Sequence, residues 1–215
     1  MNFRAPLVCE AIKSFIDAVI PPRRSERVVN GLSREELDRI AASVRRSPYS
    51  DTSYILPYRD ETVRALVWEL KYRKSTRATE LAAELLSEEV LGLASEELSP
   101  PVLIPVPMHA TRRRERGYNQ TELVCAEVSL RCNGSITYAP HALMRVRLTS
   151  PQQGLPRAKR LTNIRNAMEA DARLVRGRVC IVVDDVTTTG ATLHEAGRAL
   201  RAAGASAVHL LALAG

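Results

Sequence analysis

The stretch V-C-I-V-V-D-D-V-T-T-T-G-A-T-L, residues 179–193, decides the fold. Its first five residues, 179–183, are apolar and mostly β-branched, which is the pattern of a strand buried on both faces of a parallel sheet. Asp184 and Asp185 follow directly. A loop of small hydroxyl residues then leads into helical spacing over residues 194–203. The stretch therefore predicts a strand, an acidic pair, a small-residue loop and a helix.

The loop and the acidic pair suit two ends of one ligand. Backbone N–H groups at a helix N-terminus attract phosphate, and Gly190 would let an anion approach while threonine hydroxyls add donors. Asp184 and Asp185 would repel that phosphate, so they suit sugar hydroxyls or a Mg²⁺ shell. A ribose that carries a phosphate satisfies both. The stretch matches neither a Walker loop nor a dinucleotide-binding glycine turn.

Before residue 99 the sequence predicts an accessory region, residues 1–98, that is mostly helical. Apolar side chains recur at helical spacing in several segments, and Ser33 with Glu36 forms a capping box. The predicted elements are a short amphipathic segment over residues 7–19, a helix over 34–45, a short strand over 54–56, a helix that starts after Asp60, and a helix over 79–93.

After the prolines at 100 and 101, strands alternate with helices, which predicts an α/β domain over residues 99–215 with a parallel sheet flanked by helices. Ligands of such sheets bind beyond the carboxyl ends of the strands. The predicted elements are the first strand of the sheet over 102–107, a strongly basic loop over 109–117, a helix capped by Asn119, a short strand over 143–148, a long lid-like connection over 149–167, and a last strand over 207–214.

Charge is distributed unevenly along the chain. The net charge is +7, but residues 1–98 hold 15 Lys+Arg and 16 Asp+Glu, whereas residues 99–215 hold 16 and 8. The positive field therefore belongs to the half that carries the phosphate motif. Such a surface attracts pyrophosphate, nucleotides or a nucleic-acid backbone, and the sequence leaves these three open.

The cysteines and the N-terminal segment indicate a cytoplasmic protein. Cys9, Cys125, Cys132 and Cys180 include no C-x-x-C pair, so neither a zinc site nor a redox pair is expected, and Cys125 and Cys180 fall in apolar patterns typical of a core. Charged residues interrupt the apolar N-terminal segment, and no run approaches 18 apolar residues. Secretion and membrane association are not expected.

The segment D-D-V-T-T-T-G-A-T, residues 184–192, resembles the binding motif of type I phosphoribosyltransferases. The resemblance implies that Asp184 and Asp185 are the catalytic residues and hold the ribose hydroxyls of phosphoribosyl pyrophosphate (PRPP). It also implies a Mg²⁺ cofactor held mainly by PRPP, with the acidic pair as candidate ligands. The implied substrate-binding residues are Thr187, Thr188, Thr189, Gly190, Ala191 and Thr192 for the 5′-phosphate, with Arg112, Arg116 and Tyr118 toward the pyrophosphate and Asn119 as either a ligand contact or a helix cap.

Further segments are similar to the ComF family of competence-associated, phosphoribosyltransferase-like proteins. They are I-P-V-P-M-H-A-T-R-R-R-E-R-G-Y-N-Q at 104–120, Q-Q-G-L-P-R-A-K-R-L-T-N-I-R-N-A-M at 152–168 and L-K-Y at 70–72. Many members begin with a four-cysteine zinc module, to which only Cys9 could belong here, so no zinc is expected.

Two functions stay open at this point. The first is an enzyme that transfers a phosphoribosyl group from PRPP to an unidentified acceptor with Mg²⁺. The second is a non-catalytic competence or DNA-uptake protein that binds single-stranded DNA or a helicase-type partner. Lys71 is expected at the surface unless the helical region forms a hood over the site, and Trp68 is expected to meet either a partner or the sheet. Neither the acceptor nor the oligomeric state is marked.

Overall fold

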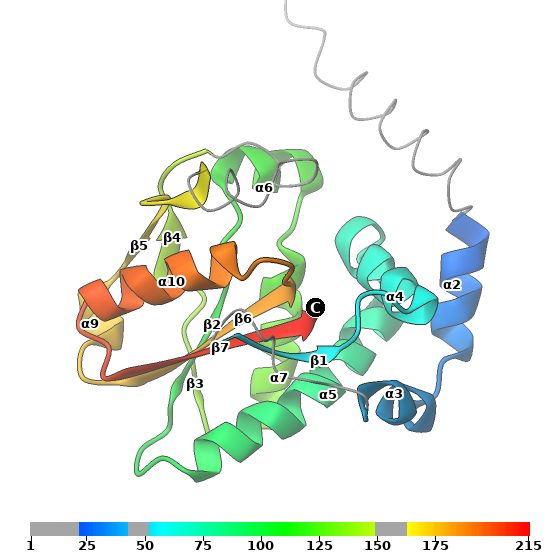
Figure 1. Ribbon diagram of the computed structural model, residues 1–215, viewed down its shortest axis with the longest axis horizontal. Coiled ribbons are helices and arrows are strands. Elements are labelled where there is room, and N and C mark those ends of the chain that lie inside the picture. The colour runs from blue at the N-terminus through cyan, green and yellow to red at the C-terminus, as the bar shows by residue number, and fades with distance from the viewer. Residues whose placement is uncertain (1–21, 43–51, 149–162) are drawn as a thin grey trace, which may run out of the picture.

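The computed structural model describes residues 22–42, 52–148 and 163–215 (Figure 1). The predicted amphipathic segment over 7–19, the end of the 34–45 helix and most of the predicted lid-like connection over 149–167 lie outside the described residues. The described ranges contain the whole of the decisive stretch and both neighbouring strands.

The centre of the molecule is a sheet of five parallel strands in the order β1-β7-β6-β2-β3 (Figure 1). The apolar strand that the sequence predicts is β6, and it lies at the centre of the sheet, where its run of β-branched residues is buried on both faces. This confirms the predicted α/β fold class. The strands are β1 Thr52–Leu56, β2 Val102–Pro105, β3 Thr137–Tyr138, β6 Val179–Val186 and β7 Ala207–Ala214.

Helices cover both faces of the sheet. On one face α10 (Ala191–Ala202) packs against β6 and β7; on the other, α7 (Gln120–Arg131) packs against β2 and β6, with α5 (Thr76–Ser95) against α7. Successive residues of β6 alternate between these layers, since Ile181 and Val183 join the α5–α7 core while Cys180 and Val182 join the α10 core.

Three helices lie beyond β1, next to the carboxyl ends of the central strands (Figure 1). They are α2 (Pro22–Gly31), α3 (Arg34–Ala41) and α4 (Glu61–Tyr72). Asp60 caps α4 by accepting the backbone N–H groups of Thr62 and Val63, as the sequence predicts. The Ser25 hydroxyl of α2 donates to the buried Glu69 carboxylate of α4 at 2.7 Å, which ties these two helices together.

The division into residues 1–98 and 99–215 stays a prediction. Within the described residues, β1 and α5 both precede residue 99, yet β1 extends the central sheet and α5 belongs to the core that covers it. The strand predicted over residues 102–107 is present as β2, Val102–Pro105, but it is not the first strand of the sheet, because β1 precedes it. A short strand with only five residues gives too weak a pattern to reveal its pairing with β7, which is distant in sequence.

Two segments differ in structure from their prediction. The basic loop over 109–117 is instead mostly helix α6 (Ala110–Arg116), because His109 caps it and arginine favours helix, and it ends at Gly117 with φ of 84°. The strand predicted at 143–148 is β4 (Leu143–Arg145), which pairs antiparallel with β5 (Met168–Ala170) outside the main sheet. A four-residue helix, α9 (Ala172–Val175), follows β5.

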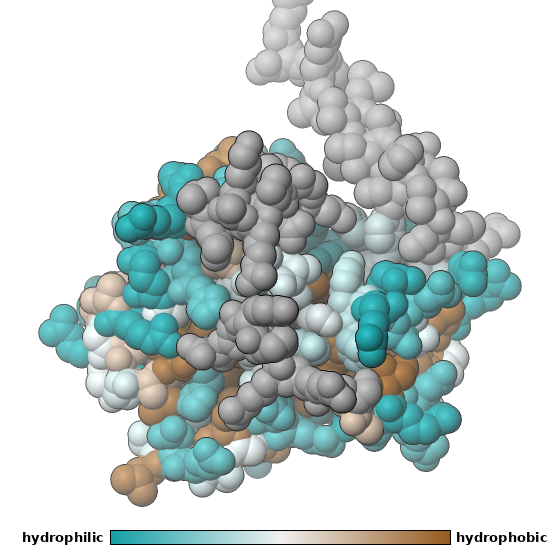
Figure 2. Space-filling view, in the orientation of Figure 1, coloured by the Kyte–Doolittle hydropathy of each residue, from teal (hydrophilic) through white to brown (hydrophobic). Residues whose placement is uncertain are grey.

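The surface turned toward the viewer in Figure 2 is hydrophilic over the β4–β5 hairpin and over α2 and α3, with apolar residues in scattered patches. The three cysteines within the described residues, Cys125, Cys132 and Cys180, are all buried, which confirms the core placement predicted for two of them. None of the helices within the described ranges has the length and apolar character needed to cross a membrane.

Candidate functional site

A cleft of about 440 Å³ separates α4 from the carboxyl ends of β2 and β6. The sheet side supplies the acidic pair and the start of α10, and the accessory side supplies one face of α4. Helix α4 therefore covers the site as a hood, and the end of residues 179–186 and the loop after them face the cleft beneath α4.

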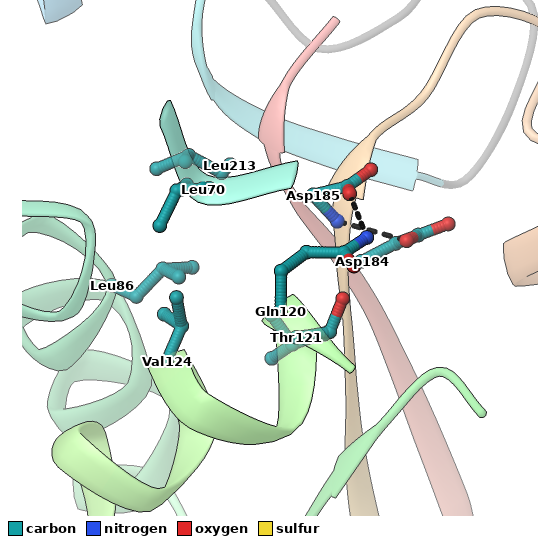
Figure 3. Close-up of a pocket in the computed structure, with 9 residues that line it drawn as sticks. Leu70, Leu86, Gln120, Thr121, Val124, Asp184, Asp185 and Leu213 are labelled. Atoms are coloured by element: carbon teal, nitrogen blue, oxygen red, sulfur yellow. Dashed lines mark hydrogen bonds between the residues drawn. The ribbon is translucent and has the colours of Figure 1, made fainter. Parts of the chain in front are cut away.

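The acidic pair forms the end of β6 itself, since the strand continues to Val186. Asp185 is buried, whereas Asp184 is partly exposed, because neighbouring strand residues point to opposite faces. Asp184 Oδ1 accepts the backbone N–H of Asp185 at 2.8 Å. Asp185 in turn pairs with Lys71 Nζ at 3.1 Å and accepts a hydrogen bond from Gln120 Nε2 (Figure 3).

Charges in the pair influence one another strongly. Burial raises the pKa of Asp184, and the adjacent Asp185 carboxylate raises it further, although Lys71 and Arg145 partly oppose this. Burial by itself would lower the pKa of Lys71, but Asp185 and Asp184 together raise it, so Lys71 stays protonated. The pair therefore lies in a setting that favours cations and hydrogen-bond donors beside it.

The loop after β6 leaves the next helix open at its start. The Thr187 N–H donates to the Ala214 carbonyl of β7 at 2.8 Å, so this residue continues the sheet. Gly190 has φ of 72°, a left-handed conformation that glycine adopts without strain. Within the described part of the chain no side chain caps α10, and Thr188 and Thr192 line the cleft beside its first turn.

Arginines form the basic side of the cleft. Arg112 and Arg116 of α6 line it as the sequence predicts, and Arg145 of β4 joins them. Burial, and then the nearby Arg112, lowers the pKa of Arg145, which indicates cations crowded together. With Arg64 and Lys71, the described residues place five cationic side chains and two carboxylates along the cleft, a charge balance that attracts a polyanion.

Tyr118 and Asn119 hold the basic side in place. The Tyr118 hydroxyl donates to the Leu70 carbonyl and accepts the Lys74 N–H, both at 3.0 Å, which fastens the α6–α7 turn to α4. Asn119 is the N-cap of α7, and its Nδ2 donates to the Val106 carbonyl at 3.0 Å. Both alternatives for Asn119 stay open, because it caps the helix and also lines the cleft.

The sequence did not assign Lys71, Gln120 or Arg145 to the site. Lys71 was expected at the surface unless the helices form a hood; they do, and it reaches Asp185. Gln120, the last residue of the G-Y-N-Q segment, is 7% exposed and lies between the acidic pair and α6. Lys71 and Gln120 lie in the L-K-Y and G-Y-N-Q segments, which could have drawn attention to them. Hydrophobic periodicity alone could not show that these two side chains reach the site.

Comparison with known proteins supports this description. The model of the phosphoribosyl transferase domain matches residues 77–215. DNA utilization protein YhgH of Salmonella typhimurium and its namesake of Escherichia coli K12 are each 34% identical over 152 residues, which is 69% of this chain and 65% of theirs. This chain thus spans 65% of the length of these relatives. Competence protein F of Haemophilus influenzae is 29% identical over 80% of this chain and 76% of its own.

The family match covers β2, β3, β6 and β7 of the central sheet and the sheet side of the cleft, whereas β1 and α4 precede it. The chain belongs to the ComF family of proteins with a phosphoribosyl transferase domain.

Proposed function

We propose that this protein binds PRPP together with Mg²⁺ and transfers its phosphoribosyl group to an acceptor. One observation carries the proposal: the acidic pair and the N-terminus of α10 face the same cleft, and among the described residues the charged side chains that line it are mostly cationic. This arrangement offers acceptors for sugar hydroxyls and donors for phosphate at neighbouring points.

PRPP fits the charges of the cleft group by group. The N–H groups at the start of α10 and the hydroxyls of Thr188 and Thr192 suit the 5′-phosphate. Asp184 and Asp185 suit the ribose hydroxyls, which donate to carboxylates. The arginines of α6 and β4 suit the pyrophosphate.

The residues present also suit Mg²⁺. Among the described residues no group of three or more His, Cys, Asp or Glu side chains gathers into a metal site, so the acidic pair would be the protein's contribution. Mg²⁺ commonly binds one or two carboxylates and takes its other ligands from phosphates and water. When bound, it would supply positive charge to the leaving pyrophosphate.

Transfer needs positioning and charge rather than a covalent intermediate on the protein. As the C1–O bond to pyrophosphate breaks, its electron pair leaves with pyrophosphate and positive charge develops on the ribose. Asp184 and Asp185 would stabilise that ribose charge, while Arg112, Arg116 and Arg145 would stabilise the leaving group. Water would be partly excluded because α4 covers the cleft.

The test is a calorimetric titration with PRPP, with and without Mg²⁺, of the parent and of the double variant Asp184→Asn/Asp185→Asn. We expect the double variant to lose binding while it keeps its fold, because these residues lie at the open end of β6. Asp171→Asn is the matched control, since Asp171 also follows a strand and caps a helix, α9, where asparagine caps equally well.

Binding of PRPP to the parent that the double variant loses and the control keeps would support the proposal. A parent that does not bind PRPP at millimolar concentration in the presence of Mg²⁺ would contradict it. Equal binding by parent and double variant would show that the ribose is placed wrongly.

A second candidate function is DNA uptake through binding of single-stranded DNA or a helicase-type partner. The names of the relatives, DNA utilization protein and competence protein, favour it, as do the exposed Arg113 and Arg114 of α6 beside the cleft. Phosphate contacts alone would give DNA affinity that falls steeply with salt, which fluorescence anisotropy of a labelled oligothymidylate measures. Absence of binding at low salt would exclude the DNA-binding version.

A further inference from the structure

A second, smaller sheet carries one of the arginines of the cleft. Arg145 lies on β4, which pairs antiparallel with β5; within the described part of the chain, these two strands do not join the five-stranded sheet. The β4–β5 hairpin packs instead against α10, the helix whose first turn faces the cleft (Figure 1). The place of the Arg145 side chain in the cleft therefore depends on how the hairpin is attached to α10.

Two charged side chains of α10 make this attachment. Glu195 lies one turn after Ala191, the first residue of α10, and is 5% exposed. Its Oε1 accepts the backbone N–H of Met168, the first residue of β5, at 3.3 Å. Arg198 donates to the Glu195 carboxylate through Nε and Nη2, both at 2.9 Å. Arg198 Nη2 also donates to the Met168 carbonyl at 3.1 Å, so the two side chains together hold both polar backbone groups of Met168.

The Glu195 carboxylate is ionised in this setting. Burial by itself would raise the pKa of Glu195, but the side chain of Arg198 and the backbone N–H groups of Met168 and Asn166 lower it. Hydrogen bonds to an ionised acceptor are stronger than those between neutral groups, so the attachment is firm. Neither Glu195 nor Arg198 is among the described residues that line the cleft, so they can act on a ligand only through the residues they hold.

Met168 is the residue that lies opposite Arg145 in the hairpin. The antiparallel register pairs Arg145 of β4 with Met168 of β5. The next step along β4 continues the contact, since the Val146 N–H donates to the Ala167 carbonyl at 2.9 Å. A shift of Met168 relative to α10 would therefore move the backbone that carries Arg145.

We propose that Glu195 and Arg198 are positioning residues, which hold the Arg145 guanidinium in the cleft and thereby set the affinity for the pyrophosphate end of the ligand. This rests on the proposed function, in which Arg145 faces the leaving pyrophosphate. The acidic pair and the first turn of α10 follow β6, whose place is fixed by pairing with β2 and β7. Loss of the attachment should therefore weaken binding at one end of the ligand and spare the other.

The test separates the two ends of the ligand. The parent and the variants are titrated calorimetrically with inorganic pyrophosphate and with ribose 5-phosphate, each in the presence of Mg²⁺. In Glu195→Gln we expect the affinity for pyrophosphate to fall by about tenfold, because the glutamine amide presents a donor where the carboxylate accepts one. The affinity for ribose 5-phosphate should stay as in the parent, a split that a general loss of structure would not produce.

Arg198→Lys is the milder variant, and it decides the question if Glu195→Gln does not fold. The Arg198 side chain is 44% exposed, and lysine keeps its charge. Lysine lacks the planar fork with which Arg198 reaches Glu195 and the Met168 carbonyl together. We expect pyrophosphate binding to weaken by about threefold and ribose 5-phosphate binding to stay unchanged.

A double variant tests whether Glu195 acts through Arg145. If it does, Glu195→Gln combined with Arg145→Gln should bind pyrophosphate no more weakly than Arg145→Gln alone. Glu127→Gln is the matched control, because Glu127 also pairs with an arginine of its own helix, Arg131 at 3.2 Å, and is not among the described residues that line the cleft. This control should bind both ligands as the parent does.

A selective loss of pyrophosphate affinity that disappears when Arg145 is already replaced would support the positioning role. Parent-like affinity for pyrophosphate in the single variants would overturn it, and so would equal losses for the two ligands or additive losses in the double variant. A parent that binds both ligands, beside variants that bind them equally well, refutes only this inference. A parent that binds neither ligand refutes the proposed function as well.

Discussion

Two connections in this molecule follow the same plan and end differently. β2 leads through α6 to α7, and β6 leads through a short loop to α10; both helices start at the carboxyl edge of the sheet. Asn119 caps α7 with its own side chain and also bonds the end of β2. At α10, Gly190 stands in the cap position with no side-chain hydrogen bond.

The difference shows how one fold separates a structural connection from a binding one. A capped helix satisfies its first N–H groups within the protein, so they are not available to a ligand. At α10 the cap position holds a left-handed glycine, which has no side chain that could occupy the space in front of the helix. The β2–α7 connection therefore contributes hydrogen bonds to the fold, and the β6–α10 connection is the one at which we propose that the phosphate binds.

The largest effect is expected from filling the cap position of α10 with a side chain. Gly190→Val places a branched side chain where an anion would approach and at φ of 72°, so we expect PRPP binding to fall by about 100-fold or more and the free energy of unfolding to fall by about 1–2 kcal/mol. Calorimetry and thermal unfolding measure the two losses.

Gly134→Val is the matched control, since Gly134 has φ of 86° after the end of α7 and nothing within 4 Å of an added Cβ. It should show a similar loss of stability and keep PRPP binding. PRPP affinity in Gly190→Val close to that of the parent would mean that the loop does not hold the phosphate.

A smaller effect is expected from removing the side-chain cap of α7. Asn119→Ala removes the cap of α7 and the hydrogen bond to Val106, so the free energy of unfolding should fall by about 1–2 kcal/mol. Asn119→Asp keeps the cap and should recover part of this loss in chemical denaturation. An Asn119→Ala variant as stable as the parent would contradict the capping role.

The smallest effect tests the acidic pair that distinguishes the open connection. Because the pKa of Asp184 is raised in the folded protein, the native state holds more protons than the unfolded state above the ordinary carboxyl pKa, and stability falls as pH rises toward the raised value. Asp184→Asn removes this cost. Its midpoint of thermal unfolding should exceed that of the parent by roughly 2–4 °C above the raised pKa, which corresponds to about 1 kcal/mol, and match it near pH 4.

Asp171→Asn should change the midpoint of thermal unfolding in the opposite direction. The Arg173 side chain lowers the pKa of Asp171, so this carboxylate stabilises the fold above its ordinary pKa, and its replacement should lower the unfolding midpoint at neutral pH. If Asp184→Asn has a lower midpoint of thermal unfolding than the parent at alkaline pH, the charged form of Asp184 stabilises the folded protein, which would contradict this prediction.

Local sequence signals anticipated those parts of the fold that local energetics control. The strand ending at Asp184 and Asp185, the caps at Asp60 and Asn119, and the buried Cys125 all follow from patterns a few residues long. The α6 helix was predicted as a loop because its arginines lack the apolar spacing by which buried helices are recognised.

The pairing of strands that are far apart in the sequence is not marked by any such short pattern. β1 pairs with β7 about 160 residues later, and β4 pairs with β5 across the predicted connection over 149–167. No short pattern records which strands become neighbours, since that depends on packing of the complete sheet.

By itself, then, the sequence determined the parallel sheet, the acidic pair at the end of its central strand and the small-residue loop, because hydrophobic periodicity and backbone chemistry act over short distances. Only the tertiary structure brought Lys71, Gln120 and the rings of Trp68 and Tyr72 to that edge. The reason is that α4 is held over the cleft by packing with α2 and α5 and by the hydrogen bond from Tyr118 to Leu70. The motif carries the contacts proposed for a sugar and a phosphate, and the tertiary structure decides which other side chains lie beside them.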